Sequence, residues 1–386
     1  MRNMEDGTMT KEGGSSSFLV PSSQFPVPFR RRKRLRVGVL FGGRSAEHEV
    51  SVVSAQGVIA AIDTARFQPV PIGVTRQGTW LTPAQTELAL QRIRSEHIRS
   101  LDEPLGDGLL YRIAALSSLR RLDIVFPLIH GPNGEDGTLQ GLLELAGVPY
   151  VGAGVAASAL GMDKGLQKTF FRHHGFPVVN DVQVRASDWA RDPQSVIRAA
   201  EATIGYPAFV KPANGGSSLG TSKARSREDL DAAIAEAFRF DRKILVEESA
   251  EGAREVEVAV LGNDEPEASP CGEITFNAEF YDYRAKYDDP ATVLHIPADV
   301  PEALSDRLRE TAIEAYKAID CAGLARVDFF VMPDGRFFLN EVNTIPGFTP
   351  MSMYPQLWEH AGLSYRDLIT RLIELGLERY QERPRA

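Results

Sequence analysis

The segment 325–348, with the sequence ARVDFFVMPDGRFFLNEVNTIPGF, contains the side chains with the clearest chemical potential in the chain. Two apolar runs flank Pro-Asp-Gly at 333–335, a combination typical of the turn of a β-hairpin. Pairing of the two strands would bring Asp328 close to Glu341 and Asn343. Two carboxylates and a carboxamide supply hard oxygen ligands, which suit Mg²⁺ together with phosphate oxygens. The pattern therefore predicts a magnesium and phosphate site at one end of the hairpin.

A simpler interpretation places each of these acids on a solvated strand face. However, Asp328 lies inside an apolar run, and Glu341 and Asn343 occupy alternate positions, so both point to the same side of their strand. Like charges on one face repel unless a cation lies between them, and unpaired carboxylates are costly to bury. We therefore favour the metal site. Arg326 shares the face of Asp328, where it either neutralises a carboxylate or stabilises negative charge that develops beside the metal.

Two earlier segments are expected to place further polar groups at the ends of strands. LRVGVLFGG, beginning at Leu35, is typical of a buried parallel strand, and Ser45 begins an amphipathic helix that continues to Ile62. Glu47 in the first turn of this helix either complements the helix dipole or, if it faces a cleft, holds an ammonium group of a ligand. His130 ends a later apolar strand, where open α/β sheets bind ligands, although a structural histidine is the alternative.

A loop rich in glycine and serine, 213–220, follows the predicted strand IGYPAFVKP. The order of its lysine and hydroxyl residues does not match a P-loop. Such a loop can still fold over phosphates while lysines, here Lys164 and Lys211, pair with phosphate oxygens. A linker is the alternative, but the position directly after a buried strand favours a functional loop.

Two more predicted strands carry acidic residues at positions suited to a nucleoside. KILVEES contains Glu247, and REVEVAVLG contains Glu255; the alternation of charge with valine in the second predicts a half-exposed antiparallel strand. A strand edge can present acceptors to an adenine amino group, and an acid can bind ribose hydroxyls. The aromatic and charged segment 281–287 is interpreted as a loop over the site or a solvated surface loop. The backbone N–H of Gly347 is close enough in sequence to the metal ligands to donate to an oxyanion.

The composition favours a soluble α/β protein of two or three domains. The chain has 386 residues, of which 43% are hydrophobic, enough for sizeable cores. No run approaches the roughly 18 apolar residues of a membrane-spanning helix, and the amino end lacks the apolar core of a signal peptide. The two cysteines, Cys271 and Cys321, are too few for a disulfide framework, which fits the reducing cytoplasm.

The charge of the chain is unevenly distributed along the sequence. The net charge is −9, but the first 36 residues contain eight Lys or Arg and three Asp or Glu, which leaves −14 for the remainder. Nucleic acid is not an expected partner of such an acidic body. Residues 1–33 combine GGSSS and PSSQFPVPF with no sustained periodicity, so we predict a disordered leader.

Taken together, the motifs from Leu35 to the carboxyl end resemble those of the D-alanine:D-alanine ligases of the ATP-grasp superfamily. The motifs are GGRSAEHEVS, HGPNGEDGTLQG, MDK, KPANGGSSLG, YDYRAKY, RVDF and NEVNTIPGFT, in the order and spacing of the family. The resemblance implies a three-domain α/β fold. An open parallel α/β domain would occupy 34–152, a central ATP-grasp subdomain 153–247 and a carboxyl-terminal subdomain 248–386, with the antiparallel sheets of the last two clasping ATP.

The resemblance also implies a reaction. Two D-alanines would be joined through an acylphosphate, with release of ADP and phosphate, for the synthesis of peptidoglycan precursors by a cytoplasmic homodimer without membrane or nucleic-acid partners. Two alternatives remain: a D-alanyl-D-lactate ligase, and a nucleotide-binding protein of the same fold without ligase activity. Tyr287 favours the dipeptide, since ester-forming relatives commonly lack this tyrosine.

The resemblance assigns roles to individual residues of this sequence. Two Mg²⁺ or Mn²⁺ ions would be held by Asp328, Glu341 and Asn343. The nucleotide would contact Lys164 and Lys211 through its phosphates, Glu247 and Glu255 through its adenine and ribose, and also Ser218. The groups implied in catalysis are Glu47, Ser217, Tyr287, Arg326 and Gly347, and those implied in substrate binding are His130, Lys286 and Ser352.

Overall fold

The computed structural model describes residues 34–96, 100–101, 119–275 and 292–382. The chain divides into two units, Met1–Lys33 and Arg34–Ala386, and the fold described below is that of the second unit. The prediction of a disordered leader at 1–33 lies outside the described residues. None of the helices in the described ranges has both the length and the apolar character needed to cross a bilayer.

The first sheet is parallel and lies near the amino end of the second unit. Its strands are β1 (Leu35–Gly42), β2 (Phe67–Val74) and β3 (Ile124–Pro127), in the order β2-β1-β3. Side chains on both faces of β1, such as Val39 and Leu40, are fully buried. Burial on both faces is the reason for the continuous apolar run, and the predicted parallel strand is confirmed.

The other two sheets in the described part are antiparallel. One has the order β4-β7-β5-β6 and the other β10-β9-β8-β11-β12. Their strands are β4 (Asp181–Arg185), β5 (Ala208–Pro212), β6 (Ser222–Ala224), β7 (Lys243–Glu248), β8 (Arg254–Gly262), β9 (Glu267–Thr275), β10 (Val293–His295), β11 (Gly323–Val331) and β12 (Phe337–Asn343).

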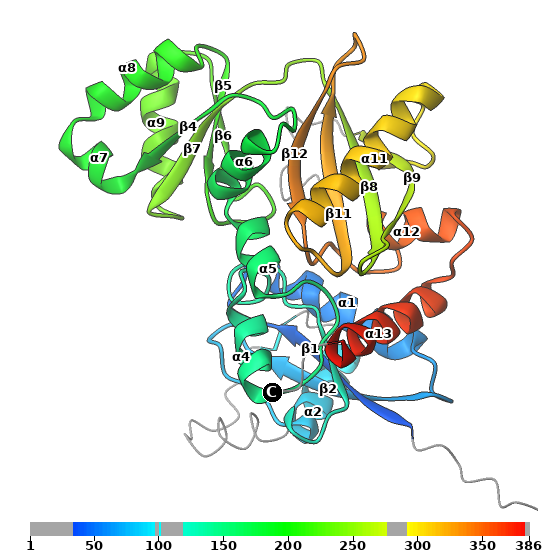
Figure 1. The fold of residues 1–386 in the computed structure, drawn as a ribbon. Coiled ribbons are helices and arrows are strands. Elements are labelled where there is room, and N and C mark those ends of the chain that lie inside the picture. Colours follow the sequence, from blue (N-terminus) through cyan, green and yellow to red (C-terminus); the bar gives the residue numbers. More distant parts are fainter. Residues whose placement is uncertain (1–33, 97–99, 102–118, 276–291, 383–386) are drawn as a thin grey trace, which may run out of the picture. The chain divides into compact units, whose positions relative to one another are not determined.

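Helices cover these sheets and connect them. They are α1 (His48–Ala61), α2 (Pro83–Glu96), α4 (Thr138–Ala146), α5 (Val155–Met162), α6 (Lys164–His173), α7 (Ala186–Arg191), α8 (Pro193–Thr203), α9 (Arg227–Ala237), α11 (Glu302–Ala318), α12 (Met353–His360) and α13 (Tyr365–Gln381). Helix α1 begins after Glu47, close to the predicted start, and runs alongside β1 (Figure 1).

Helix α13 packs against the parallel sheet and contributes to its core. Its residues Leu368 and Leu372 belong to the same buried cluster as Val37 and Ile124. At Gly376 the helix approaches so closely that an added Cβ would lie 2.8 Å from the Cδ1 atom of Ile124. Figure 1 shows α13 beside α1 and β1, although it is the last helix of the chain. The domain boundaries that we drew from the sequence stay predictions.

The prediction that β8 is a half-exposed strand was wrong. The strand lies between β9 and β11, and its residues from Val256 to Gly262 are all buried, including Glu257 at 4% exposure. Alternation of charge and valine separates two faces of a strand but does not show that one of them faces solvent. Here the valines face the apolar core and the acids face a cavity lined by polar groups.

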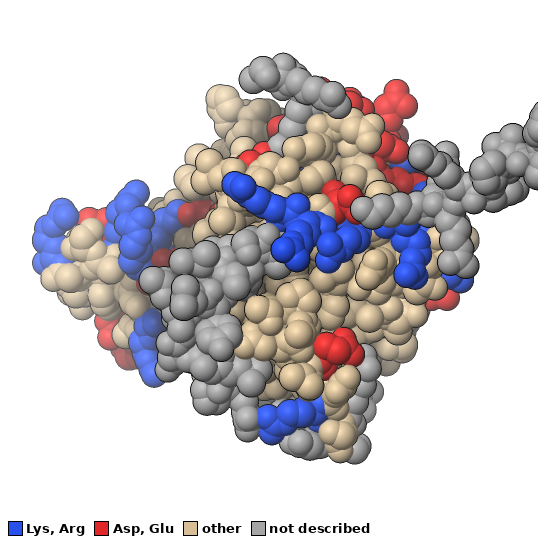
Figure 2. Space-filling view, turned by 90° about the horizontal axis from the view of Figure 1, so that it is seen from below, with Lys and Arg blue, Asp and Glu red and all other residues tan. Residues whose placement is uncertain are grey.

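The surface carries charges of both signs. In Figure 2, which views the molecule from below Figure 1, a band of Lys and Arg side chains crosses the middle of the face, with Asp and Glu at several separate places. Basic side chains are thus gathered on one part of this face, although the net charge of the chain is −9.

Candidate active site

A cavity of about 1180 Å³ collects the polar residues that the sequence analysis singled out. Its walls come from strands β7, β8, β11 and β12, from the loop 215–221, and from residues that follow β1 and β3. Every predicted site residue within the described ranges lines it: Glu47, His130, Lys164, Lys211, Ser217, Ser218, Glu247, Glu255, Arg326, Asp328, Glu341, Asn343, Gly347 and Ser352. Lys286 and Tyr287 lie outside the described residues.

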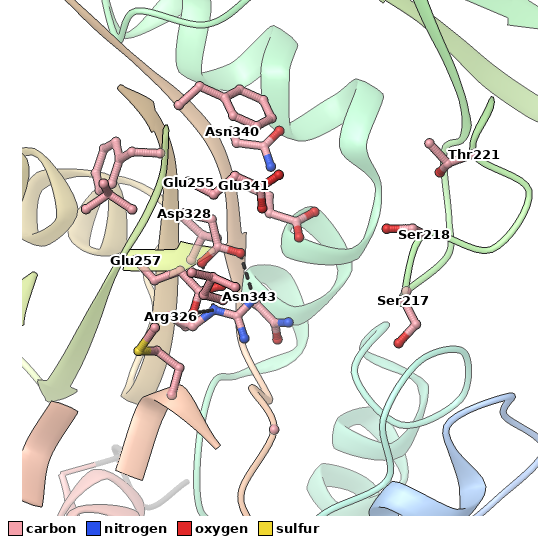
Figure 3. Close-up of a pocket in the computed structure, with 18 of the residues that line it drawn as sticks. Ser217, Ser218, Thr221, Glu255, Glu257, Arg326, Asp328, Asn340, Glu341 and Asn343 are labelled. Atoms are coloured by element: carbon pink, nitrogen blue, oxygen red, sulfur yellow. Dashed lines mark hydrogen bonds and ion pairs between the residues drawn. The ribbon is translucent and has the colours of Figure 1, made fainter. Parts of the chain in front are cut away.

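The predicted hairpin of β11 and β12 is confirmed, and its register places the expected metal ligands together. Asp328 pairs directly with Glu341, and Arg326 pairs with Asn343. A β-bulge follows Asp328. The next residue of β11, Phe329, pairs with Leu339, so Asn340 of β12 is skipped in the register. Residues from the middle of β11 and from the end of β12 line the cavity, so the three oxygen-bearing side chains lie on one wall of it (Figure 3).

Arg326 binds two carboxylates on this wall. Its Nε and one terminal nitrogen donate to the two carboxylate oxygens of Asp328, both at 2.7 Å, and its Nε lies 3.0 Å from Oε2 of Glu257. Burial lowers the pKa of Arg326, but Asp328 and Glu257 outweigh it and raise that pKa well above its usual value. Glu257 was missed by the sequence analysis, although its position two residues after Glu255 in the alternating strand was a usable signal.

The chemistry of the donor set fits a hard divalent cation, with two qualifications. The predicted ligands are two carboxylates and a carboxamide, and no group of three His, Cys, Asp or Glu suited to a metal occurs among the described residues, so the set depends on Asn343. Both carboxylates already contact cations: Asp328 contacts Arg326, and Glu341 lies 3.2 Å from Nζ of Lys164. Bound metal would therefore share these carboxylates with Arg326 and Lys164, or displace the two side chains.

The loop 215–221 faces this wall from the opposite side of the cavity, as Figure 3 shows for Ser217, Ser218 and Thr221. The hydroxyl of Ser217 donates a hydrogen bond to Oε1 of Glu47. Gly216 passes so close to Glu47 that an added Cβ would lie 2.7 Å from Oε2, which explains the glycine. Glu47 and Ser217, which the resemblance implies in catalysis, are thus in direct contact.

His130 and Glu135 are two buried polar residues, and the charge of Glu47 acts on both. Nδ1 of His130 donates to the backbone oxygen of Ile345 at 3.0 Å, so in the neutral ring Nε2 is an acceptor, and it has no partner. Burial lowers the pKa of His130. Burial and the charge of Glu47 raise the pKa of Glu135 to about 8, and its Oε2 has no partner either. Glu135 was missed in the sequence, where only the glycine-rich turn around it was noted.

The candidate phosphate lysines both reach the cavity, and both are held by partners there. Lys164 donates to the backbone oxygen of Gly215 at 2.8 Å, which ties helix α6 to the loop. Lys211 lies 2.5 Å from Oε2 of Glu247. The other oxygen of Glu247 lies 3.4 Å from Nζ of Lys168, a buried lysine that the sequence analysis missed. Its place four residues after Lys164, on the same helix face, was the available signal.

The end of the cavity after β12 contains Gly347 and Ser352. An added Cβ at Gly347 would lie 3.1 Å from Oγ of Ser352, so these two residues are close neighbours. Oγ of Ser352 accepts from the backbone N–H of Thr349 at 3.1 Å. The hydroxyl is thereby oriented at the cavity surface.

Comparison with known proteins identifies the family of this chain. The family model described as "D-ala D-ala ligase N-terminus" matches residues 36–153, and "D-ala D-ala ligase C-terminus" matches residues 170–374. The chain belongs to the D-alanine–D-alanine ligase family. The predicted family resemblance is therefore confirmed.

Members of the D-alanine–D-alanine ligase family match this chain over nearly its whole length. A D-alanine–D-alanine ligase from Geobacillus thermodenitrificans is 48% identical over 355 residues, 91% of this chain and 97% of that protein. One from Deinococcus radiodurans is 50% identical over 345 residues, 89% of this chain and 98% of that protein.

Solved structures of two related ligases share the fold. The D-alanine–D-alanine ligase of Coxiella burnetii matches with a TM-score of 0.73 and 35% identity, covering 90% of this chain and 95% of that one. A D-Ala:D-Ser ligase from Enterococcus faecalis matches with a TM-score of 0.75 and 36% identity, covering 89% and 100%. The predicted three-domain α/β ATP-grasp fold is confirmed.

Proposed function

We propose that this chain joins two molecules of D-alanine into D-alanyl-D-alanine and cleaves ATP to ADP and phosphate, for the synthesis of peptidoglycan precursors. One observation carries the proposal: acids, lysines and Arg326 converge on a single cavity that the loop 215–221 closes from the other side. Such a site can neutralise phosphates and exclude water from a hydrolysable acylphosphate.

In this mechanism the carboxylate of the first D-alanine attacks the γ-phosphorus of ATP, and ADP leaves. The amine of the second D-alanine then attacks the acyl carbon, and phosphate leaves as the peptide bond forms. Lys164 and Lys211 bind phosphate oxygens, with Ser218 of the loop beside them, because cations and hydroxyl donors offset the repulsion between the nucleotide and the attacking carboxylate.

Asp328, Glu341 and Asn343 would hold two Mg²⁺ or Mn²⁺ ions, whose chemistry is to neutralise the oxygens of the transferred phosphoryl group. Two cations, Arg326 and Lys164, contact three carboxylates here, those of Glu257, Asp328 and Glu341. The excess of negative charge favours binding of a further cation.

The substrates are assigned to different parts of the cavity. Glu47 binds the ammonium group of the first D-alanine, with His130 close by. Arg326 and the N–H of Gly347 stabilise the oxyanion that forms when the amine attacks. Ser352 binds the carboxylate of the second D-alanine, a role in which the sequence also predicts Lys286. Glu247 and Glu255 are assigned to adenine and ribose.

The assembly and location follow the family resemblance. We propose a homodimer, and a cytoplasmic location because the reaction consumes ATP. Analytical ultracentrifugation of the full chain at micromolar concentration tests the first: sedimentation as a monomer throughout would exclude the homodimer.

There is an alternative candidate for the second substrate, the one that supplies the amine. Since a D-Ala:D-Ser ligase shares the fold at a TM-score of 0.75, D-serine is the alternative second substrate. The test is to incubate the protein with ATP, Mg²⁺ and D-alanine, and to measure phosphate and the mass of the product. Phosphate release that does not depend on D-alanine would overturn the proposal. Parallel reactions with D-serine or D-lactate added identify a mixed dipeptide or an ester.

A further inference from the structure

Lys168 is a buried lysine that has no assigned role in the mechanism. It lies on α6, one turn after Lys164, and its side chain is 1% exposed. Its Nζ lies 3.4 Å from Oε1 of Glu247, and it is not among the residues that line the cavity. It therefore approaches the nucleotide site from behind, through Glu247.

Glu247 stands between two lysines that differ in access to the cavity. Lys211, at 2.5 Å from Oε2, has a side chain that is 14% exposed and lines the cavity. Glu247 itself is 2% exposed in its side chain. Burial raises the pKa of Glu247, but Lys168 and Lys211 outweigh it and keep that pKa below its usual value. The carboxylate is thus charged, with Lys211 accessible to a ligand and Lys168 sealed inside the protein. Burial lowers the pKa of Lys168, and the charge of Glu247 is the main influence that opposes this shift.

A nucleotide phosphate that recruits Lys211 must separate it from Glu247. A buried carboxylate that loses its only cation costs about 3–5 kcal/mol, which would oppose phosphate binding. Lys168 removes this penalty, because a second cation remains beside the carboxylate. The pair has room to tighten: neither Nζ of Lys168 nor Oε1 of Glu247 makes a hydrogen bond, and their separation exceeds ordinary hydrogen-bonding distance.

We propose that Lys168 is a positioning residue that keeps Glu247 neutralised while Lys211 transfers from Glu247 to the phosphates of the nucleotide. The inference deepens the proposed function, because it rests on nucleotide binding in this cavity. Lys168 touches neither substrate nor phosphate in this scheme and acts only through Glu247 and Lys211.

The distinguishing experiment compares ligands with and without phosphates. Binding of ATP, ADP and adenosine to the full chain is measured by calorimetry with Mg²⁺ and without D-alanine. Lys168→Met is expected to weaken ATP and ADP by at least about tenfold, equivalent to about 1.4 kcal/mol. Adenosine does not recruit Lys211, so its affinity should change by less than about threefold. Equal losses for adenosine and ATP would indicate a merely structural lysine and overturn the proposal.

Proton uptake gives a second readout. In Lys168→Met, Glu247 would lose its remaining ion-pair partner when ATP binds, so its pKa should rise and a proton should be taken up. Calorimetry in buffers with different ionisation enthalpies measures this proton, which the parent chain should not take up through Glu247. Identical proton uptake in parent and variant would contradict the proposed transfer of Lys211 from Glu247 to the phosphates.

Three further variants serve as controls. Lys168→Arg keeps the charge and should bind ATP within a few-fold of the parent. Lys317→Met removes a lysine from an exposed position on α11 and should leave all three affinities unchanged. The double variant Lys168→Met/Glu247→Gln removes the buried charge as well, so its ratio of ATP to adenosine affinity should be higher than that of Lys168→Met alone; the ratio cancels any direct contact between Glu247 and the nucleoside. An equal ratio of ATP to adenosine affinity in the single and double variants would overturn the proposal.

The double variant also protects the test against misfolding, because it places no buried charge beside methionine. Failure of the proposed function is seen separately. A parent chain that binds ATP but releases no phosphate with D-alanine would disprove the ligase activity. A Lys168→Met variant that binds ATP and ADP like the parent would disprove only the proposed role of Lys168.

Discussion

Ser217 donates a hydrogen bond to Glu47 from a position 170 residues further along the chain. Ser217 and its neighbour Ser218 have positive φ angles of 49° and 55°, a conformation that is uncommon for residues with a side chain. The bond joins the loop 215–221 to the start of α1, and it spans the cavity that the two segments share. The amino-terminal α/β region and the central sheet are therefore linked at the site itself.

Removing this link should impair catalysis more than folding. Hydrogen bonds to charged groups contribute about 1.5–3 kcal/mol, so Ser217→Ala should lower kcat/KM for D-alanine by roughly 10- to 100-fold. Ser195→Ala, at an exposed position on α8, is the matched control. Steady-state phosphate release measures both variants. A Ser217→Ala enzyme with the kinetics of the control would show that the link has no role in turnover.

Asn343→Ala tests the predicted metal ligand. Loss of one ligand oxygen should raise the Mg²⁺ concentration for half-maximal activity by roughly tenfold, a change of about 1.4 kcal/mol in metal affinity. The folding cost should be smaller, about 1 kcal/mol, since Oδ1 of Asn343 accepts one bond, from the N–H of Ile345 at 3.2 Å. Magnesium titrations of the initial rate and thermal melts separate the two effects. Asn180→Ala, at an exposed site, is the control, and an unchanged titration would exclude Asn343 as a ligand.

Arg326→Met should destabilise the metal-free chain. Asp328 and Glu257, 13% and 5% exposed, would lose a shared cation, at a cost of about 3–5 kcal/mol. If a metal binds Asp328, then Mg²⁺ should raise the Tm of the variant more than that of the parent, because the ion replaces the lost charge. Thermal unfolding with EDTA and with Mg²⁺ tests this. Equal shifts in the two proteins would indicate that no metal binds beside Asp328.

Glu135→Gln should flatten the pH dependence of stability. Burial, first, and Glu47, second, raise the pKa of Glu135 from 4.5 to about 8, so the folded chain holds this proton more tightly than the unfolded chain. The stabilisation is complete below pH 4.5 and is lost as the pH rises through about 8. The slope contributed by this group is at most about 1.4 kcal/mol per pH unit.

Urea unfolding of the metal-free chain between pH 5 and 8 measures this contribution. The free energy of unfolding of the parent should fall with pH relative to that of Glu135→Gln. Glu310→Gln, at an exposed position on α11, should follow the parent. Parallel curves for parent and Glu135→Gln would mean that Glu135 is charged at neutral pH.

The elements that could be predicted are those whose signals lie within a short stretch. The hairpin is an example: a turn sequence and two alternating strands specify that Asp328 opposes Glu341, and the register agrees. The strand, glycine turn and helix around Glu47 were likewise predictable from periodicity. Family motifs extended this to the fold and to which residues share a cavity.

The misses share a physical cause. Glu257 was placed on a half-exposed strand, because alternation reports the two faces of a strand and not what covers them. Lys168 was not singled out in the sequence, because only the packing of α6 against β7 places Glu247 beside it. His130 had two interpretations in the sequence, and the structure shows that one ring nitrogen is satisfied by Ile345 while the other has no partner.

The sequence by itself thus determined the order of strands and helices, the hairpin that carries Asp328 and Glu341, and membership of a ligase family, because periodicity, turn chemistry and motif spacing are local properties. Only the tertiary structure decided which charges meet. Contacts such as Lys168 with Glu247 and Arg326 with Glu257 join segments distant in the chain. Their strength depends on burial and on separations of a few ångströms, and both arise only when the sheets and helices pack.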